Sequence, residues 1–347
     1  MKTKHFLALA AALLCCALPS CLKEGRNELL PGVAPTETGT LSINVDGILP
    51  GATKADPVAY TTTKDYEVAV NKLEVFIFNA TGVLERYING TELTKSGIQL
   101  TVGSKTVYTV VNGQDLAGSV KSLSELESLV APFQAYNSTV VSSGMIMTGK
   151  NTVEIVANTN ATCDVTVRRL VYRVALEKVT SALPSQLGTV TVEGMFMVNG
   201  GADLRLCDIQ TAGNTTIPPY NTLGKKSGGA TVVSPETSDA PALMYSTINL
   251  STTVDISTDP KFVYSYPSSC STANYEQKFV VQTLIAGVRY YYPIKLSGIR
   301  SNETVTINLV INNLGSTDPN KEVEKGTATV NVTVSGWDSG ISKEYTI

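Results

Sequence analysis

Apolar and polar residues alternate along most of this chain with a period of two, which is the pattern of β-strands buried on one face. Residues 41–46 and 327–334 show this alternation most clearly. Residues 68–79 are apolar at both alternating sets of positions, so we expect a central strand that is covered on both sides. Further strands are predicted at residues 83–88, 107–111, 145–147, 153–156, 164–179, 190–198, 243–250, 262–266, 278–285, 288–296, 305–311 and 342–347.

The one clear helix signal lies among these strands, at residues 122–130. Ser122 and Glu125 have the spacing of a capping box, in which the two side chains bond each other's backbone N–H groups at the helix start. Leu123, Leu126 and Val130 fall on a single face of this helix. A long series of strands with one short helix predicts an all-β fold.

The composition agrees with sheets and bounds the number of domains. Only 16% of the residues are charged and 43% are hydrophobic, with 15 Tyr and 27 Gly, which is typical of layered sheets rather than of helical bundles. A chain of 347 residues exceeds what one hydrophobic core usually organises. We therefore predict two domains, at residues 41–177 and 178–347.

The beginning of the chain has the pattern of an export signal. Two lysines precede an uncharged apolar run at residues 6–17, which is too short to span a bilayer, since a spanning helix needs about 20 residues. The small residue before Cys21 resembles a bacterial lipobox, which implies that residues 1–20 are removed and that Cys21 carries the lipid of a tether at residues 21–40. The alternative is a plain signal peptide that leaves Cys21 an ordinary thiol.

The composition also excludes several kinds of site. The only histidine, His5, lies in the export signal, so the mature chain has no Ser-His or Cys-His dyad and no imidazole metal site. No cysteines after residue 20 are spaced as CxxC, and a net charge of −3 without a basic run gives no reason to expect nucleic acid. We predict a protein that is not an enzyme and has no cofactor or metal, although a hydrolase that uses only carboxylates stays open.

Four segments, in order along the chain behind the lipobox, resemble the fimbrillins, the lipoprotein-derived subunits of the type V pili of Bacteroidetes. The resemblance implies two transthyretin-like β-sandwich domains in tandem, with the short helix in the first. It also implies that a trypsin-like protease trims the N-terminal end and that the subunits assemble by strand exchange. The segments are residues 73–79, 105–112, 168–174, and 315–319 running into 326–337.

The residues agree with strand exchange on physical grounds. Removing a strand from a sandwich leaves unpaired backbone groups beside an apolar groove, which a strand from a neighbour can fill. Residues 41–54 are the predicted removable segment, because Lys54 is an isolated basic residue in a breaker-rich loop just after the first strand, and cleavage there makes Ala55 the new N-terminus. Residues 326–347 are the predicted donor, a tail that extends beyond the fold. The apolar positions are Leu41, Ile43 and Val45 in the removable strand and Val330, Val332 and Val334 in the donor.

We therefore predict a structural stalk subunit of a surface fimbrium that supports adhesion and has copies of itself and other pilus subunits as partners. Its precursor is expected at the cell outer membrane, held there by a lipid that is expected to include palmitate. Two alternatives stay open: a monomeric surface lipoprotein that binds a glycan or host ligand, and an accessory tip or anchor subunit of the pilus. A terminal strand at each end and an isolated lysine also occur in ordinary sandwiches.

Overall fold

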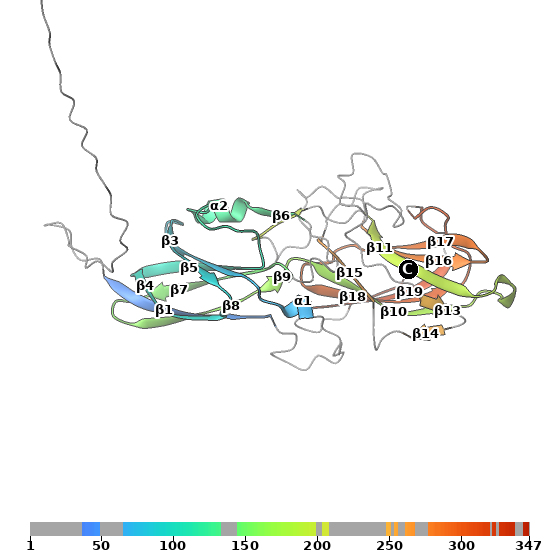
Figure 1. The fold of residues 1–347 in the computed structure, drawn as a ribbon, viewed down its shortest axis with the longest axis horizontal. Helices are drawn as coiled ribbons and strands as arrows, with labels where there is room; N and C mark the ends of the chain where they lie inside the picture. Colours follow the sequence, from blue (N-terminus) through green and yellow to red (C-terminus); the bar gives the residue numbers. More distant parts are fainter. Residues whose placement is uncertain are drawn as a thin grey trace, which may run out of the picture. The chain divides into compact units, whose positions relative to one another are not determined.

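The structure of the chain, a computed structural model, is built almost wholly from β-strands (Figure 1). It describes residues 37–48, 65–132, 144–198, 203–207, 248–250, 253–255, 261–267, 277–319, 321–323, 326–336 and 343–346. Within these residues, helical structure is confined to α1 (Asp65–Val68), α2 (Leu123–Ser128) and a 3-10 turn at Ser185–Leu187. The predicted all-β fold is confirmed.

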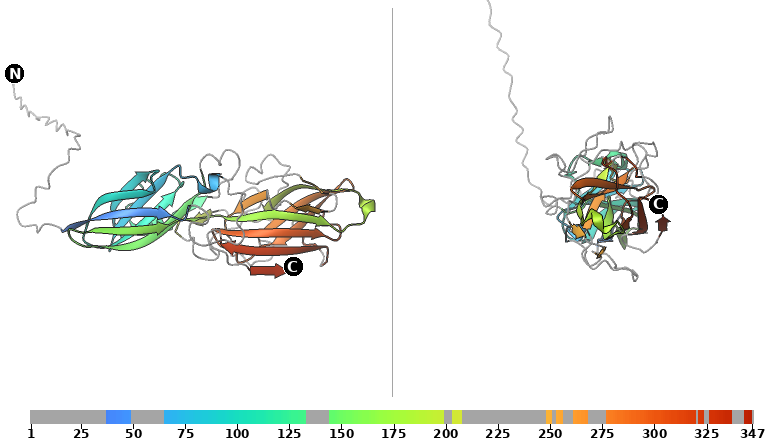
Figure 2. Two further views of the ribbon diagram at one scale, coloured as in Figure 1. Left: turned by 90° about the horizontal axis from the view of Figure 1, so that it is seen from below. Right: turned by 90° about the vertical axis from the view of Figure 1, so that its right-hand side faces the viewer.

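The first half of the chain forms two sheets, with strand orders β4-β1-β8 and β3-β2-β5-β7-β9. Apolar side chains from both sheets meet in one buried cluster, so the sheets are the two layers of a β-sandwich. In Figure 2, β1 is the blue strand of the smaller layer. The strands are β1 (Thr38–Asp46), β2 (Leu73–Asn79), β3 (Leu84–Gly90), β4 (Thr94–Thr101), β5 (Gly103–Val111), β7 (Met147–Ile155), β8 (Asn160–Thr166) and β9 (Arg168–Arg169).

The second half forms another sandwich around its own buried cluster. One layer has the order β14-β10-β18-β19-β20, with β15 also paired to β10, and the other has the order β13-β11-β16-β17. The strands are β10 (Tyr172–Ser181), β11 (Val190–Val198), β13 (Ile248–Leu250), β14 (Thr253–Asp255), β15 (Lys261–Ser265), β16 (Lys278–Ile285), β17 (Val288–Lys295), β18 (Glu303–Ile311), β19 (Ala328–Gly336) and β20 (Lys343–Thr346). A further short pair joins β6 (Val130–Pro132) to β12 (Asp203–Arg205).

Strand β2 shows why a segment that is apolar on both faces must be covered on both sides. It lies between β3 and β5 in the larger sheet of the first sandwich. Leu73, Val75 and Ile77 face the cluster that includes β1, whereas Phe76 and Phe78 belong to a different buried cluster on the opposite side of the sheet. The prediction of a central strand is confirmed, and the strand begins at Leu73 because α1 occupies residues 65–68.

Two local signals in the sequence also correspond to the structure. Helix α2 has the predicted capping box, since Glu125 N donates to Ser122 Oγ at 3.2 Å and Ser122 N donates to Glu125 Oε2 at 3.2 Å. The helix ends at Ser128, because the chain enters β6 two residues later. Ala286 and Gly287 have φ values of 50° and 79°, which makes the turn between β16 and β17 a tight hairpin.

The prediction of one long strand at residues 164–179 is wrong. The segment is divided among β8, β9 and β10, which pair with β1, β7 and β18 respectively. Alternation of side chains does not reveal where a chain leaves one sheet for another, because the period is the same in both. Since β10 pairs with β18 from Arg173 onward, strand pairing of the second sandwich begins before residue 177, and the boundary at 177 stays a prediction.

Strand β4 is an element that the sequence pattern did not predict. Its residues are mostly polar and exposed, so the alternation is weak. It nevertheless pairs with β1 from Thr38↔Thr101 to Asn44↔Thr94. Backbone hydrogen bonds with β1 therefore make this segment a strand, although its side chains do not show the alternating pattern.

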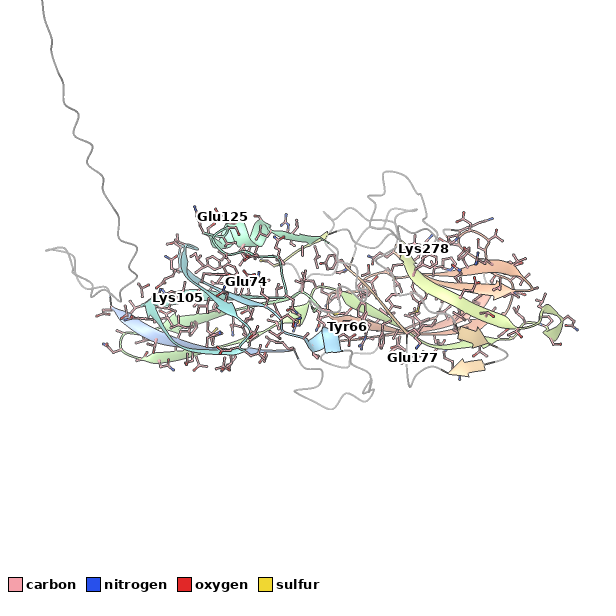
Figure 3. The ribbon with its side chains drawn as sticks, in the orientation of Figure 1. Tyr66, Glu74, Lys105, Glu125, Glu177 and Lys278 are labelled. Atoms are coloured by element: carbon pink, nitrogen blue, oxygen red, sulfur yellow. The ribbon has the colours of Figure 1, made fainter. Side chains whose placement is uncertain are left out.

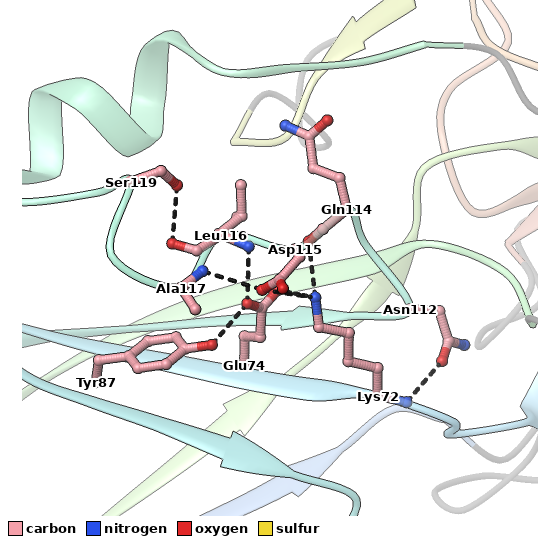
Figure 4. A network of polar contacts seen from close by, with 9 residues as sticks. All are labelled: Lys72, Glu74, Tyr87, Asn112, Gln114, Asp115, Leu116, Ala117 and Ser119. Carbon is pink, nitrogen blue, oxygen red and sulfur yellow. Dashed lines mark hydrogen bonds and ion pairs between the residues drawn. The ribbon is translucent and has the colours of Figure 1, made fainter.

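A buried carboxylate fixes the loop that follows β5 (Figure 4). Glu74 Oε1 accepts hydrogen bonds from Tyr87 Oη at 2.8 Å and from Leu116 N at 3.0 Å, and Lys72 Nζ lies 3.1 Å from Glu74 Oε2. Burial and the neighbouring Glu74 raise the pKa of the Tyr87 phenol well above its usual value, so the phenol stays a donor. Figure 3 places Glu74 within the first sandwich, away from the strand β1 described below.

We expect the variant Val332→Asp to lower the free energy of unfolding of the intact protein by about 4 kcal/mol or more. The reason is that Val332 is only 3% exposed and packs in the core of the second sandwich, where a carboxylate would lie unpaired. Urea denaturation measures the change. The neighbouring Asn331→Asp is the matched control, because Asn331 is exposed and should change stability by no more than about 0.5 kcal/mol. Equal stability of the two variants would contradict the burial of Val332.

Candidate functional site

The predicted removable segment forms the central strand of its sheet. Strand β1 pairs antiparallel with β4 on one side and parallel with β8 on the other, from Thr40↔Asn160 to Asp46↔Thr166. In this sheet, β4 and β8 are connected only through β1. Removing β1 would therefore leave two facing strand edges without their ladder partners.

The inner face of β1 is buried against the larger sheet. Leu41, Ile43 and Val45 all lie in the core cluster of the first sandwich. Their neighbours in this cluster come from β2, β5, β7 and β8, and include Val75, Val107, Met147 and Cys163. These three predicted residues thus fill one continuous apolar layer, and their removal would expose it.

The outer face of β1 is polar and is hydrogen-bonded to β8. Thr40 Oγ1 donates to Asn160 Oδ1 at 3.0 Å, and Asn44 Nδ2 donates to Asp164 Oδ1 at 2.8 Å. Both contacts are exposed to solvent, so each contributes modestly to stability. They do, however, show that a strand next to β8 can place hydrogen-bond donors opposite Asn160 and Asp164.

The end of the removable segment is held by a buried arginine. The Arg169 guanidinium, 0% exposed, donates from Nη2 to Ile48 O at 2.7 Å and from Nε to Glu67 O at 2.8 Å. Its Nη1 also donates to Asn302 Oδ1 at 3.2 Å. Ile48 and Glu67 stand on either side of residues 49–64 in the sequence, so one cation binds the chain before and after the segment that contains Lys54.

A second buried network surrounds the Glu67 side chain, which extends from α1 near the labelled Tyr66 in Figure 3. Arg173 Nη1 donates to both carboxylate oxygens, at 3.1 and 3.2 Å, and Tyr264 Oη donates to Glu67 Oε1 at 2.6 Å. Burial, and then the negative charge of Glu67, raise the pKa of the Tyr264 phenol well above its usual value. The phenol therefore remains protonated and keeps α1 attached to β15.

The predicted donor segment is not a tail outside the fold. Strand β19 pairs with β18 over nine positions, from Glu303↔Gly336 to Ile311↔Ala328, and β20 pairs with β19 at the outer edge (dark red in Figure 2). Val330, Val332 and Val334 are all buried in the core of the second sandwich. The expectation of a free tail is therefore corrected, because these valines are already buried within the chain's own second sandwich.

The remaining predicted positions lie outside the residues that the structure describes. These are Cys21, Lys54 and Ala55. Sequence reasoning missed Arg169 and Glu67. For Arg169 there was a signal, because it directly precedes the apolar run Leu170-Val171, and a charged residue beside such a run can be buried with it.

Two further searches concern only the described part of the chain. No group of three or more His, Cys, Asp or Glu side chains there is placed to bind a metal ion. No helix there is long and apolar enough to cross a membrane.

Comparisons with known proteins match part of the chain to a described family. A family model described as "Major fimbrial subunit protein (FimA)" matches residues 39–194, a little under half of the chain. The match begins in β1 and ends in β11. No relative among curated proteins matches the sequence.

Solved structures share the fold over most of the chain. A protein from Bacteroides eggerthii that is assigned to cell adhesion has 18% identity and a TM-score of 0.63, over 88% of this chain and 97% of that one. A fimbrilin (FimA) from Porphyromonas gingivalis has 16% identity and a TM-score of 0.58, over 87% of this chain and 98% of that one. A cell-adhesion-assigned protein from Parabacteroides distasonis has 16% identity and a TM-score of 0.56, over 87% and 99%.

Residues 39–194 match the family of major fimbrial subunit proteins, and the two sandwiches share the fold of a solved fimbrilin. These findings confirm the resemblance of the chain to the fimbrillins of Bacteroidetes.

We expect Ile43→Ala to destabilise the uncleaved protein by about 2–5 kcal/mol, because a buried side chain of the central strand β1 is replaced by a cavity. Asp46→Ala is the matched control on the same strand, since the Asp46 side chain is exposed, and it should change stability by no more than about 0.5 kcal/mol. Urea denaturation of both variants checks the difference. A loss for Ile43→Ala no larger than for the control would show that β1 is not part of the core.

Proposed function

We propose that this protein is a stalk subunit of a surface fimbrium, exported as a lipoprotein, trimmed after Lys54 and polymerised by strand exchange. The observation that carries the proposal is the place of β1, which is the central strand of its sheet and, among the described residues, the strand nearest in sequence to the predicted cleavage position. A central strand that ends shortly before an isolated lysine can be released by a single cut.

Release of β1 supplies the driving force for assembly in this proposal. The freed groove would expose the apolar layer against which Leu41 and Ile43 pack, together with the unpaired backbone edges of β4 and β8. Exposed apolar surface costs about 25 cal/mol per Å², and each unsatisfied backbone group adds to that cost. A strand from another subunit restores both the ladder and the packing.

Strand β19 is suited to this role by its length and periodicity. Both β1 and β19 have nine residues, and both place three aliphatic side chains at alternate positions on one buried face. Leaving its own sheet would cost β19 its pairing with β18 and the burial of its valines. Because that cost is offset only when a vacated groove is present, intact subunits should remain monomeric until they are cleaved.

The first test of this proposal is cleavage. Light trypsin treatment followed by N-terminal sequencing should give Ala55-Asp56-Pro57, since Lys54 is the first basic residue after β1. The Lys54→Gln variant should stay monomeric under the same treatment, whereas Lys64→Gln, at the next basic position, should be cleaved and polymerise. Polymerisation of Lys54→Gln without loss of β1 would sink the proposal.

The second test concerns export. If Cys21 is acylated, the wild-type precursor should incorporate a labelled fatty-acid analogue and sediment with membranes, because several acyl chains hold a protein firmly. The Cys21→Ser variant should lose both the label and the membrane association, and form fewer fimbriae. Replacing Cys15, which lies within the export signal, is the matched control and should leave labelling unchanged. Equal labelling of Cys21→Ser and wild type would exclude the lipidated precursor.

A further inference from the structure

Strand β1 and strand β19 carry the same pattern over eleven residues, together with the residues that flank them. Residues 38–48 read TGTLSINVDGI, and residues 327–337 read TATVNVTVSGW. Both begin with a threonine, a small residue and a threonine, continue with three aliphatic residues at alternate positions, and reach a glycine two positions after the last of them. The similarity extends beyond the alternation that any half-buried strand shows.

We propose that the donor strand enters the groove in the direction and register of β1, so that Gly336 takes the place of Gly47 and the carbonyl of the next residue accepts the hydrogen bond of Arg169. This inference rests on the proposed function, since it requires that β19 replaces β1. It goes further by assigning two specificity-determining elements of the acceptor groove: a position that only glycine fits, and a buried cation at the groove's end.

The position of Gly47 admits no side chain. Its φ is +81°, a conformation that favours glycine, and a Cβ there would lie 2.4 Å from Val167 O and 2.9 Å from Thr166 Cγ2. Because Val167 O belongs to the backbone, relieving this contact would require a shift of the chain, and the positive φ would still strain any other residue. Any strand that follows the path of β1 past Asp46 therefore needs a glycine at this place.

In the direction of β1, Gly336 is the one glycine of residues 326–347 that meets this need while the valines remain on the inner face. With Gly336 at position 47, Val334, Val332 and Val330 fall at the positions of Val45, Ile43 and Leu41. The other glycine after β19 is Gly340, and placing it at position 47 would put Asp338 where Val45 packs. A charged side chain in that apolar layer is strongly disfavoured.

The opposite direction meets an obstacle in both of its possible registers. With Ala328 at position 47, alanine meets the clash and the positive φ. With Gly326 at position 47 instead, Val334 falls at position 39, where a Cβ lies 2.4 Å from Val156 O. In the direction of β1, Ala328 takes the place of Gly39, where a Cβ also lies 2.4 Å from a backbone atom, Val156 O, so the turn after β7 has to shift to admit the methyl group. Position 39 differs from position 47 in its φ, which is not positive, so the backbone conformation there does not itself disfavour alanine.

The outer face of β19 also matches the partners that β1 has on β8. Thr40 and Asn44 donate side-chain hydrogen bonds to Asn160 and Asp164. In the proposed register their places are taken by Thr329 and Thr333, whose hydroxyl groups can donate to the same two acceptors. The incoming strand can therefore supply donors to Asn160 and Asp164 in place of Thr40 and Asn44.

Arg169 marks the far end of the groove. When the segment up to Lys54 is removed, this fully buried guanidinium loses one of its hydrogen bonds, from Nη2 to Ile48 O at 2.7 Å. A strand that brings a carbonyl to this point restores that charged hydrogen bond and is therefore favoured over a shorter strand. The chain continues past Gly336 in the sequence, and the next residue provides that carbonyl.

The first experiment uses a peptide with the sequence of residues 327–337, acetylated and amidated, added to subunits that have been trimmed after Lys54 and separated from the released segment. Fluorescence anisotropy measures binding. The Gly336→Ala peptide should bind at least about tenfold more weakly than wild type, because alanine is strained and clashes at this position. The Ser335→Ala peptide is the matched control and should bind within about twofold of wild type, since position 335 falls on the outer face.

The second experiment reads the register and the direction from cross-links. Ile43 is paired with Cys163 and Leu41 with Ala161, all on the inner face. With copper–phenanthroline and air as the oxidant that accepts the two electrons, a Val332→Cys peptide should form a disulfide with Cys163, and more efficiently than Val330→Cys or Val334→Cys peptides. With the Ala161→Cys subunit, the Val330→Cys peptide should react in preference to Val334→Cys. Uncleaved subunits should not react at Cys163, because β1 covers this thiol, whose pKa burial raises to about 11.

These outcomes separate the inference from the proposed function. If the wild-type peptide binds and the Gly336→Ala peptide binds equally well, or if the preferred cross-link is at another position, strand exchange stands and the register is overturned. A preference of Ala161→Cys for the Val334→Cys peptide would overturn the direction. If the wild-type peptide does not bind trimmed subunits at all, β19 is not the donor, and both the proposed function and this inference fail.

Discussion

The double pairing of β1 is the constraint on which the first sandwich depends. Within the described residues, β1 connects β4 and β8 by pairing with both, and through Leu41 and Ile43 it closes the apolar layer over the larger sheet. Most strands that can be removed from a protein lie at a sheet edge, where little is lost. Here the strand that the proposed cut releases is central. Its loss would leave backbone hydrogen-bonding groups of β4 and β8 unpaired until another strand takes its place.

The two ends of the chain stand in different energetic situations before cleavage. Strand β1 is bound on both sides, whereas β19 has the long strand β18 on one side and only the four-residue pairing with β20 on the other. In the proposed assembly, β19 exchanges one long partner for the two partners of β1. Val332 is buried in its own sandwich before the exchange and would be buried in the groove of another subunit after it. The favourable free energy of assembly then comes from filling the groove that β1 has left.

Arg169 connects the removable segment to the rest of the molecule. A buried guanidinium is tolerated only when its donors are satisfied, and here they are satisfied by Ile48 O, Glu67 O and Asn302 Oδ1. Because Glu67 is in turn held by Arg173 and hydrogen-bonded to a tyrosine of β15, helix α1 keeps its place independently of β1. Loss of the segment before Lys54 therefore removes one acceptor and leaves the remainder of this network in position.

The sequence by itself determined the all-β class, the covered strand β2, the capping box of α2 and the hairpin between β16 and β17, because each depends on neighbours in the chain. Tertiary structure alone decided where residues 164–179 change sheets, that polar β4 pairs with β1, and that Val332 is buried in its own sandwich rather than on a free tail. The physical reason is that alternation reports that a face is buried but not what buries it. Partners far apart in the sequence, such as Arg169 and Ile48, are set by packing.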